Sequence, residues 1–409
     1  MSRALKTAGQ AAPQDPLPYG RHWIDESDIA AVVEVLRSDR LAHGPKVGEF
    51  ESALAQAVGA KAAAASSSGT AALHLALAAL DVGQGDVCVA PAITFLATAT
   101  AARMCGAEVV FADVDPATGL MTAQTLEAAV ARAGRRIKAV LPVHLGGRLC
   151  AMEEIATLAR SHGAAVVEDA CHALGGEDAA GHAVGACAFS DAAAFSLHPV
   201  KTLAAGEGGM VTTNDAERAE RMRRLANHGV TKDLALIRSP DLTLDPAGAL
   251  NPWSYEQIEL GFNYRMNEME AALGLSQLAR LDRFVSRRRE LAGLYDLMLQ
   301  PLAPDIAPIQ AAPTDRPCLH LYQVAIDFDR LGAARAEVMR RMAGQGIGTQ
   351  VHYIPVYRQP YFEDRYGRQR LDGAEAFYDR VLALPLYPAM QDSDVERVVA
   401  ALTQAIGLG

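Results

Sequence analysis

The stretch AAVVEDACHALGG, residues 164–176, predicts a buried strand that runs directly into acidic residues. Four alanine and valine residues precede Glu168 and Asp169, and two glycines close the segment. A short apolar run bounded by turn residues is typical of a strand that is covered on both faces of a sheet. We therefore expect Asp169 at the carboxyl end of a strand, where α/β sheets bind their ligands.

Further runs of strand length lie on either side of this segment, and helical patterns separate several of them. The runs are 87–90 (VCVA), 108–112 (EVVFA), 138–143 (KAVLPV), 191–195 (DAAAF) and 209–213 (GMVTT). We expect helices at 27–38, capped by Asp25 or Ser27, and at 69–80. This alternation predicts a doubly wound α/β domain with a parallel or mixed sheet.

Residues 230–260 break the pattern. They contain Pro240, Pro246 and Pro252 and show no clear periodicity. A long irregular segment inside a compact protein is often functional or lies at an interface. We expect a loop here that has a function or lies at an interface.

A second pattern begins at Asn267, which has Glu270 three residues later and so predicts a capping box. We expect one long helix through the 270s and 280s, followed by strands at 321–327 and 349–354 and a helix at 333–343. These elements predict a smaller α+β domain. The expected parts of the chain are a flexible tail at 1–17, a large domain at 18–265 and a smaller domain at 266–409.

Composition narrows the class of protein. Half of the 409 residues are hydrophobic and the net charge is −10, as in a globular enzyme and unlike a disordered chain or a nucleic-acid-binding protein. No run of about 18 apolar residues predicts a membrane span, and no signal peptide is evident, so we expect a cytoplasmic protein. The six cysteines form no C-x-x-C pair, which favours reduced thiols over disulfides or a metal site.

Lys201 has the most informative setting among the six lysines. It lies in FSLHPVKTLAAGEGG, residues 195–209, after an expected strand and before a glycine-rich turn. A lysine that forms a Schiff base must reach a carbonyl and be partly unprotonated. A loop at a strand end allows both, although an ordinary exposed lysine explains this segment equally well.

Asp169 and His172 form the second candidate group. A buried carboxylate at a strand end needs a charged or hydrogen-bonding partner. The protonated pyridine nitrogen of pyridoxal 5′-phosphate (PLP) would serve, and this pairing strengthens the cofactor as an electron sink. His172 would then lie against the ring face. A capping aspartate and a structural histidine are the alternative interpretation of these two residues.

The segment SSSGT, residues 66–70, opens the expected helix at 69–80. Free backbone N–H groups and hydroxyls at a helix N-terminus bind phosphate well, but a plain N-cap has the same pattern. Asp169, His172, His182 and His198 are residue types that could bind a metal ion. Their spacing fits no zinc pattern, so no metal is expected.

Eight segments in a fixed order resemble the DegT/StrS family of sugar aminotransferases, from about Pro18 to the C-terminus. They are SSSGT (66–70), PAITFLAT (91–98), PVHLGG (142–147), EDACHALGG (168–176), FSLHPVK (195–201), GEGGMVTTND (206–215), GFNYRMNEMEAALGLSQL (261–278) and VHYIPVY (351–357). The opening PYGRHWIDESDI (18–29) is most similar to the PseC branch. That branch aminates C4 of a UDP-linked 4-keto-6-deoxy sugar on the path to pseudaminic acid, a sugar of flagellins and cell surfaces.

The resemblance implies the PLP-dependent transferase type I (aspartate aminotransferase-like) fold, with a large mixed-sheet α/β domain that binds PLP and a smaller α+β C-terminal domain. It implies that L-glutamate donates the amino group to the UDP-ketosugar and that homodimers share their active sites. Lys201 would carry the cofactor as a Schiff base and shuttle protons, and Asp169 would pair with the pyridine nitrogen. Some relatives are dehydratases with histidine in place of the lysine, so Lys201 favours transamination.

The remaining roles follow from the same resemblance. His172 and Phe95 would sandwich the cofactor ring. The phosphate would be held by Ser68, Gly69, Thr70 and Ser196. Asn263 and Arg265 would reach the phosphate in the neighbouring subunit. The nucleotide-sugar pocket would include Tyr19, His43, His352, Tyr353 and Tyr357, although relatives often carry other polar residues at the position of His43.

Three alternatives stay open. The substrate would be another nucleotide-linked ketosugar (dTDP or GDP, aminated at C3 or C4), or the chain would be a PLP-binding regulator without catalysis. A nucleotide-binding α/β protein without PLP is the third alternative, and the lack of a G-x-G-x-x-G motif after the first strand weighs against it.

Overall fold

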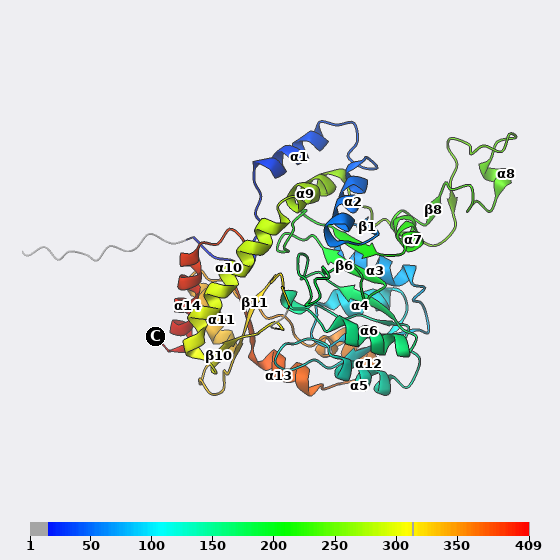
Figure 1. The fold of residues 1–409 in the computed structure, drawn as a ribbon. Helices are drawn as coiled ribbons and strands as arrows, with labels where there is room; N and C mark the ends of the chain where they lie inside the picture. Colours follow the sequence, from blue (N-terminus) through cyan, green and yellow to red (C-terminus); the bar gives the residue numbers. More distant parts are fainter. Residues whose placement is uncertain (1–14, 313–314, 409) are drawn as a thin grey trace, which may run out of the picture.

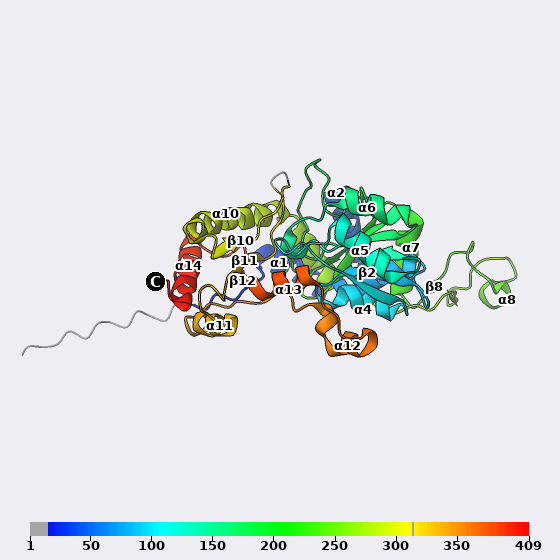
Figure 2. The same ribbon diagram turned by 90° about the horizontal axis from the view of Figure 1, so that it is seen from below.

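The computed structural model describes residues 15–312 and 315–408. Figure 1 shows a large sheet flanked by helices, with a smaller part built on α10, α11 and α14 beside it. Seen from below in Figure 2, the smaller part lies at one end of the molecule, apart from the helices that cover the large sheet. Residues 1–14 of the expected tail lie outside the described residues.

The large sheet has seven strands in the order β1-β7-β6-β5-β4-β2-β3. Its strands are β1 (Ala62–Ser66), β2 (Val87–Pro91), β3 (Glu108–Ala112), β4 (Ala139–Val140), β5 (Ala165–Asp169), β6 (Ala192–Ser196) and β7 (Gly209–Thr213). Only β7 runs antiparallel to its neighbours, β1 and β6, so the sheet is mixed, as predicted. All the other strands therefore end at one edge.

Helices cover this sheet because their apolar residues face it. They are α2 (Lys46–Val58), α3 (Gly69–Ala79), α4 (Leu96–Met104), α5 (Ala123–Ala133), α6 (Met152–Ser161) and α7 (Ala216–Ala226). Helix α3 is buried along nearly its whole length, because it consists mainly of alanine and leucine and packs on β6, β7 and α4. The expected helices at 27–38 and 69–80 are confirmed as α1 (Glu26–Leu36), capped by Asp25, and α3, capped by Ser68.

The smaller part is an antiparallel sheet covered by helices, as the expected α+β unit requires. Its strands are β10 (Ile306–Pro308), β11 (Tyr322–Ile326) and β12 (Val381–Leu384), and its helices include α10 (Leu281–Leu299), α11 (Arg335–Gly344) and α14 (Asp392–Ile406). Leu17 belongs to this core, since it is buried and its N–H donates to Gly346 O at 2.8 Å. Leu17 is therefore packed against the smaller part, whereas the tail predicted at 1–17 otherwise stays a prediction.

Two expectations in the C-terminal third are wrong. The single long helix is two helices, α9 (Glu268–Leu278) and α10, although the capping box of Asn267 and Glu270 is confirmed. Residues 349–354 form no strand; Gln350 makes only an isolated bridge with Ala383. Helix α9 packs on α1 and α2 while α10 packs on α14, so the boundary at 265/266 stays a prediction.

Shorter elements complete the described chain. They are η1 (Leu145–Gly147), β8 (Val230–Thr231), α8 (Pro240–Thr243), β9 (Glu256–Gln257), η2 (Gln300–Leu302), η3 (Val356–Arg358), α12 (Pro360–Tyr366) and α13 (Asp372–Arg380). Residues 230–260 are irregular, as predicted, and project from the body beyond α7 (Figure 1). Large apolar side chains such as Trp253 and Leu260 are exposed on this projection.

None of the helices in the described part of the chain combines the length and apolar character that crossing a membrane requires. All six cysteines lie in this described part of the chain and none is in a disulfide there.

Candidate active site

The candidate residues gather at one edge of the large sheet. Asp169 and Ser196 are the last residues of β5 and β6, and Phe95 follows β2. Strand β1 leads to Ser68 at the same edge, since β1 and β6 are both antiparallel to β7. The carboxyl ends of strands therefore place these residues together, as expected for an α/β sheet.

Asp169 is the buried acid of this edge. Its Oδ2 accepts a hydrogen bond from Thr98 Oγ1 at 2.6 Å, and its Oδ1 accepts from the Cys171 N–H at 3.2 Å. Thr94 Oγ1 lies 2.7 Å from Thr98 Oγ1 and so donates to it. The ion pairs among residues 15–312 and 315–408 include none with Asp169, so its negative charge lacks a cationic partner in direct contact.

Lys201 lies in the turn that follows β6. Its N–H donates to His198 O at 2.8 Å, which fixes the turn. Burial lowers the pKa of the Lys201 amine below its ordinary value, although nearby Cys171 and Asp169 oppose this shift. A larger fraction of this amine is therefore neutral than of an exposed lysine, as nucleophilic and base chemistry requires.

His172 is held as a neutral ring. Its Nδ1 accepts the Gly146 N–H at 3.2 Å, so the proton of the neutral ring is on Nε2, which lies 3.3 Å from Tyr353 Oη. Burial holds the pKa of His172 well below its ordinary value, and the positive charge of Lys201 adds to the shift. The His172 ring therefore offers a flat, uncharged face.

Aromatic rings extend from His172 in two directions. The Tyr353 and His172 rings stack at an angle of 22°, with their centroids 6.2 Å apart. The Phe95 ring centroid lies 5.9 Å from that of Tyr353, and about half of the Phe95 surface is exposed. The ring centroid of His352 lies 5.5 Å from that of Tyr19 and 4.8 Å from that of Tyr353. The structure thus brings together five of the predicted residues in one chain of neighbouring rings.

His320 belongs to this group and was missed in the sequence. Its ring centroid lies 4.8 Å from that of His172, and its N–H donates to Gly146 O at 2.9 Å. Burial lowers the pKa of His320, again with a contribution from Lys201. The Nδ1 atoms of His320 and His352 are buried and make no hydrogen bond. The only sequence signal was a histidine just before the expected strand at 321–327.

The predicted phosphate residues also meet. A Cβ on Gly69 would lie 2.7 Å from Ser196 Cβ, so only glycine lets the start of α3 approach the end of β6 this closely. Ser68 caps α3 by accepting the Ala71 N–H at 3.1 Å, and Thr70 follows in the first turn. The helix N-terminus and three hydroxyls therefore lie near one point, an arrangement that favours an anion.

Asn263, Arg265 and His43 lie elsewhere. They line a hollow of about 640 Å³ that also includes Glu51 and Glu268, and Arg265 Nη1 donates to Asn227 Oδ1 at 2.9 Å. The lining of this hollow includes neither Lys201 nor Asp169. His43 is thus grouped with the two residues expected to serve a neighbouring subunit, and not with Tyr19 or His352.

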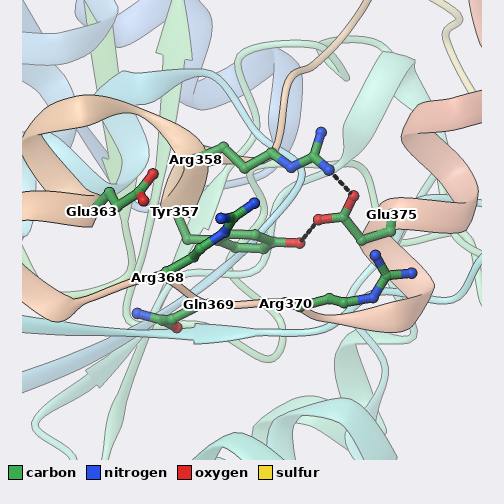
Figure 3. A pocket seen from close by; sticks show the side chains of 7 residues that line it. All are labelled: Tyr357, Arg358, Glu363, Arg368, Gln369, Arg370 and Glu375. Atoms are coloured by element: carbon green, nitrogen blue, oxygen red, sulfur yellow. Dashed lines mark hydrogen bonds and ion pairs between the residues drawn. The ribbon is translucent and has the colours of Figure 1, made fainter.

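Tyr357 is placed differently from the other predicted substrate residues. It is fully buried, and its hydroxyl donates to Glu375 Oε1 at 2.6 Å and accepts the Leu371 N–H at 3.2 Å. Figure 3 shows this hydroxyl and Arg358 meeting the same carboxylate at one side of a 430 Å³ pocket. The Tyr357 hydroxyl therefore already makes two hydrogen bonds within the fold, and its predicted contact with the substrate stays a prediction.

Two of the possible metal-binding histidines make other contacts. His182 Nδ1 lies 2.9 Å from Asp178 Oδ2 on the surface, and His198 Nδ1 accepts the Val200 N–H at 3.4 Å. Within the described ranges, no three histidine, cysteine or acidic side chains are grouped as metal ligands would be.

The sequence of the chain is similar to a known protein family and to individual proteins. Residues 22–403 match the DegT/DnrJ/EryC1/StrS aminotransferase family. The spore coat polysaccharide biosynthesis protein SpsC of Bacillus subtilis is 40% identical over 393 residues, which are 95% of this chain and 97% of SpsC.

Two solved structures are similar over nearly the whole chain. Helicobacter pylori PseC, an aminotransferase involved in the biosynthesis of pseudoaminic acid, has a TM-score of 0.86 at 28% identity, with 96% of this chain and 100% of PseC covered. S. venezuelae DesV, solved in complex with a ketimine intermediate, has a TM-score of 0.82 at 31% identity, with 96% and 99% covered.

Proposed function

The chain belongs to the DegT/DnrJ/EryC1/StrS aminotransferase family, and on this basis we propose that it transfers the amino group of L-glutamate to C4 of a UDP-linked 4-keto-6-deoxy-N-acetyl hexose. The chain is a sugar aminotransferase, and its cofactor is PLP. The observation that supports amino transfer is the buried Lys201 near the Asp169 carboxylate, which accepts hydrogen bonds but has no cationic partner among the described residues.

The residues present fit this cofactor. Asp169 offers a negative charge without a cationic partner among the described residues, as a protonated pyridine nitrogen requires. Gly69 leaves the space in which the start of α3 and Ser196 meet, where a phosphate would be held. His172 and Phe95 offer an uncharged ring and a half-exposed ring for stacking.

Different side chains would hold the cofactor, transfer the proton and orient the buried carboxylate. When bound, PLP supplies an electron sink for the carbon that loses its proton. Lys201 would carry the cofactor and, once freed, take the proton from Cα of the amino donor with Nζ. Burial suits this amine to act first as base and then as acid, because its pKa lies below that of an exposed lysine. Thr98 orients the Asp169 carboxylate through its hydroxyl.

The sugar, the pathway and the assembly are finer proposals. Similarity to PseC supports a UDP-linked 4-keto sugar on the way to pseudaminic acid or a related surface sugar. Tyr19, His352 and Tyr353 would contact the sugar, since they lie together beside His172. We also propose a cytoplasmic homodimer in which Asn263, Arg265 and His43 serve the neighbouring subunit's site.

A product assay across UDP- and dTDP-linked ketosugars tests the substrate. The PLP-loaded protein, L-glutamate and each sugar are incubated, and the amino sugar is identified by mass and by the position of its nitrogen. We expect amination at C4 of the UDP-linked 4-keto-6-deoxy-N-acetyl hexose. Amination of a dTDP-sugar alone would contradict the UDP assignment, and turnover of any ketosugar would exclude a purely regulatory role.

A further inference from the structure

Glu268 is a buried acid in the wall of the hollow that His43, Asn263 and Arg265 also line. It is the first residue of α9, which Asn267 caps, so the N-terminal end of this helix stabilises its negative charge. Within residues 15–312 and 315–408 the Oε1 atom of Glu268 has no hydrogen-bond partner. The hydrogen bond of the Glu268 carboxylate is therefore made by Oε2 alone.

Glu268 holds the loop that joins α1 to α2 at three places. Its N–H donates to Leu41 O at 3.1 Å, and its Oε2 accepts the Lys46 N–H at 2.8 Å. Between these two contacts Gly44 lies directly against the carboxylate, so closely that a Cβ at this position would collide with Oε2. The path of the loop from residue 41 to residue 46 therefore follows the Glu268 side chain.

His43 lies in the middle of this loop in an uncommon backbone conformation. Its φ is 56°, in the left-handed region that residues other than glycine rarely adopt. His43 is exposed, so the packing of its own side chain does not hold it there. The contacts that Glu268 makes with Leu41 and Lys46, on either side of His43, hold this conformation in their place.

We infer that Glu268 is a positioning residue, which fixes His43 in the same hollow as Asn263 and Arg265. The inference rests on the proposed function, in which these three residues serve the neighbouring subunit's site. The walls of the hollow include residues 42–48 and 263–268, from distant parts of the chain, and the contact of Glu268 with the Lys46 N–H joins them. Through Glu268, His43 is placed to contact the ketosugar, whereas Asn263 and Arg265 serve the cofactor phosphate.

Separate measurement of the two halves of the reaction tests this role. Glu268→Ala removes the acceptor of the Lys46 N–H and releases the loop, so KM for the ketosugar should rise about tenfold. The rate at which L-glutamate converts the bound cofactor should stay within about twofold, because Asn263 and Arg265 keep their places. Glu268→Gln keeps an acceptor oxygen for the Lys46 N–H and should bring KM back to within about threefold of wild type.

His43→Ala shows whether Glu268 acts through His43. If it does, the loss in His43→Ala already includes the loss in Glu268→Ala, so KM of the double variant should equal that of His43→Ala within about twofold. Glu49→Gln, at a surface ion pair with Lys46, is the control and should behave like wild type. Losses that multiply in the double variant, an equal loss in the reaction with L-glutamate, or an unchanged KM in Glu268→Ala overturns the inference.

A second variant keeps the test decisive if Glu268→Ala does not fold. Gly44→Ala places a Cβ against Oε2 and so displaces the loop while the acid stays in place. KM for the ketosugar should again rise about tenfold, with the reaction of L-glutamate within about twofold of wild type. A wild-type KM in a folded Gly44→Ala protein would contradict the positioning role.

Failure of the proposed function is distinguishable from failure of this inference. The ketosugar used is the one that the product assay identifies, so a wrong nucleotide or sugar changes the substrate and not the comparison. If wild type aminates no ketosugar, the proposed function is wrong and the inference falls with it. If wild type aminates a ketosugar and the Glu268 and Gly44 variants do so with an unchanged KM, only the role of Glu268 is wrong.

Discussion

Thr98 Oγ1 donates a hydrogen bond to Asp169 Oδ2 over 2.6 Å, so a hydroxyl in the first turn of α4 orients the buried acid at the end of β5. Both groups are buried, and Thr94 donates in turn to Thr98. The acid is thus fixed in position by neutral donors while its charge stays available for a cationic group of the cofactor.

Replacing Thr98 by valine removes this donor while keeping the shape of the side chain. Asp169 Oδ2 then loses its partner in a buried setting, so the free energy of unfolding of the cofactor-free protein should fall by about 1–3 kcal/mol. Thr98→Ser keeps the hydroxyl and should lose less. Urea unfolding of the three proteins measures this, and equal stability of Thr98→Val and wild type would contradict the orienting role.

Asp169→Asn removes the charge and keeps the size of the side chain. If Asp169 pairs with the pyridine nitrogen, the rate of amino transfer should fall about 100-fold or more while the fold is kept. Stopped-flow absorption of the reaction with L-glutamate gives the rate, and circular dichroism checks the fold. Asp178→Asn, at an exposed ion pair with His182, is a matched control that should react normally. Near-wild-type transfer by Asp169→Asn would exclude the pairing.

Gly69→Ala should weaken both the fold and the binding of PLP. The added Cβ would lie 2.7 Å from Ser196 Cβ, and such overpacking typically costs about 1–3 kcal/mol. Ser196→Gly removes the opposing Cβ, so the double variant should recover part of the lost melting temperature. Thermal unfolding of the cofactor-free proteins and PLP titration measure the two effects. Full stability in Gly69→Ala alone would show that this close approach does not matter.

His352 makes stability depend on pH. Burial lowers the pKa of its ring to about 3, against about 6.5 in the unfolded chain. Between these values the unfolded state binds a proton that the folded state excludes, so stability falls as the pH falls. In His352→Gln the loss of unfolding free energy from pH 7 to pH 5 should be about 2 kcal/mol smaller than in wild type. Equal losses in both proteins would show that the ring accepts its proton in the folded state.

Local patterns in the sequence were sufficient to predict the strand ends and the residues attached to them. Asp169 and Ser196 are the last residues of buried strands that run in the same direction, so both lie at the same edge of the sheet. Gly69 and Ser68 were predictable because a helix cap is a local feature of three or four residues. These residues account for the predicted centre of the site.

Other features depend on contacts between distant segments. Arg280 pairs with Asp25 and Asp28 at the point where the expected long helix breaks into α9 and α10. His320 donates its N–H to Gly146 O and lies beside His172, although both partners come from a distant part of the sequence. Strand β1 was missed because AAAAS (62–66) has no branched or aromatic residue, and alanine favours helices.

The visible absorption spectrum of the PLP-loaded protein, before and after addition of L-glutamate, tests the central claim most directly, with Lys201→Ala as the comparison. We predict that wild type shows the band of a lysine-bound cofactor and that L-glutamate converts it to the band of the aminated cofactor. Lys201→Ala should keep its fold and convert the cofactor at least about 1,000-fold more slowly. Conversion by Lys201→Ala at a rate near that of wild type, or absence of the band in wild type, would contradict the assignment of Lys201 and with it the account of this site.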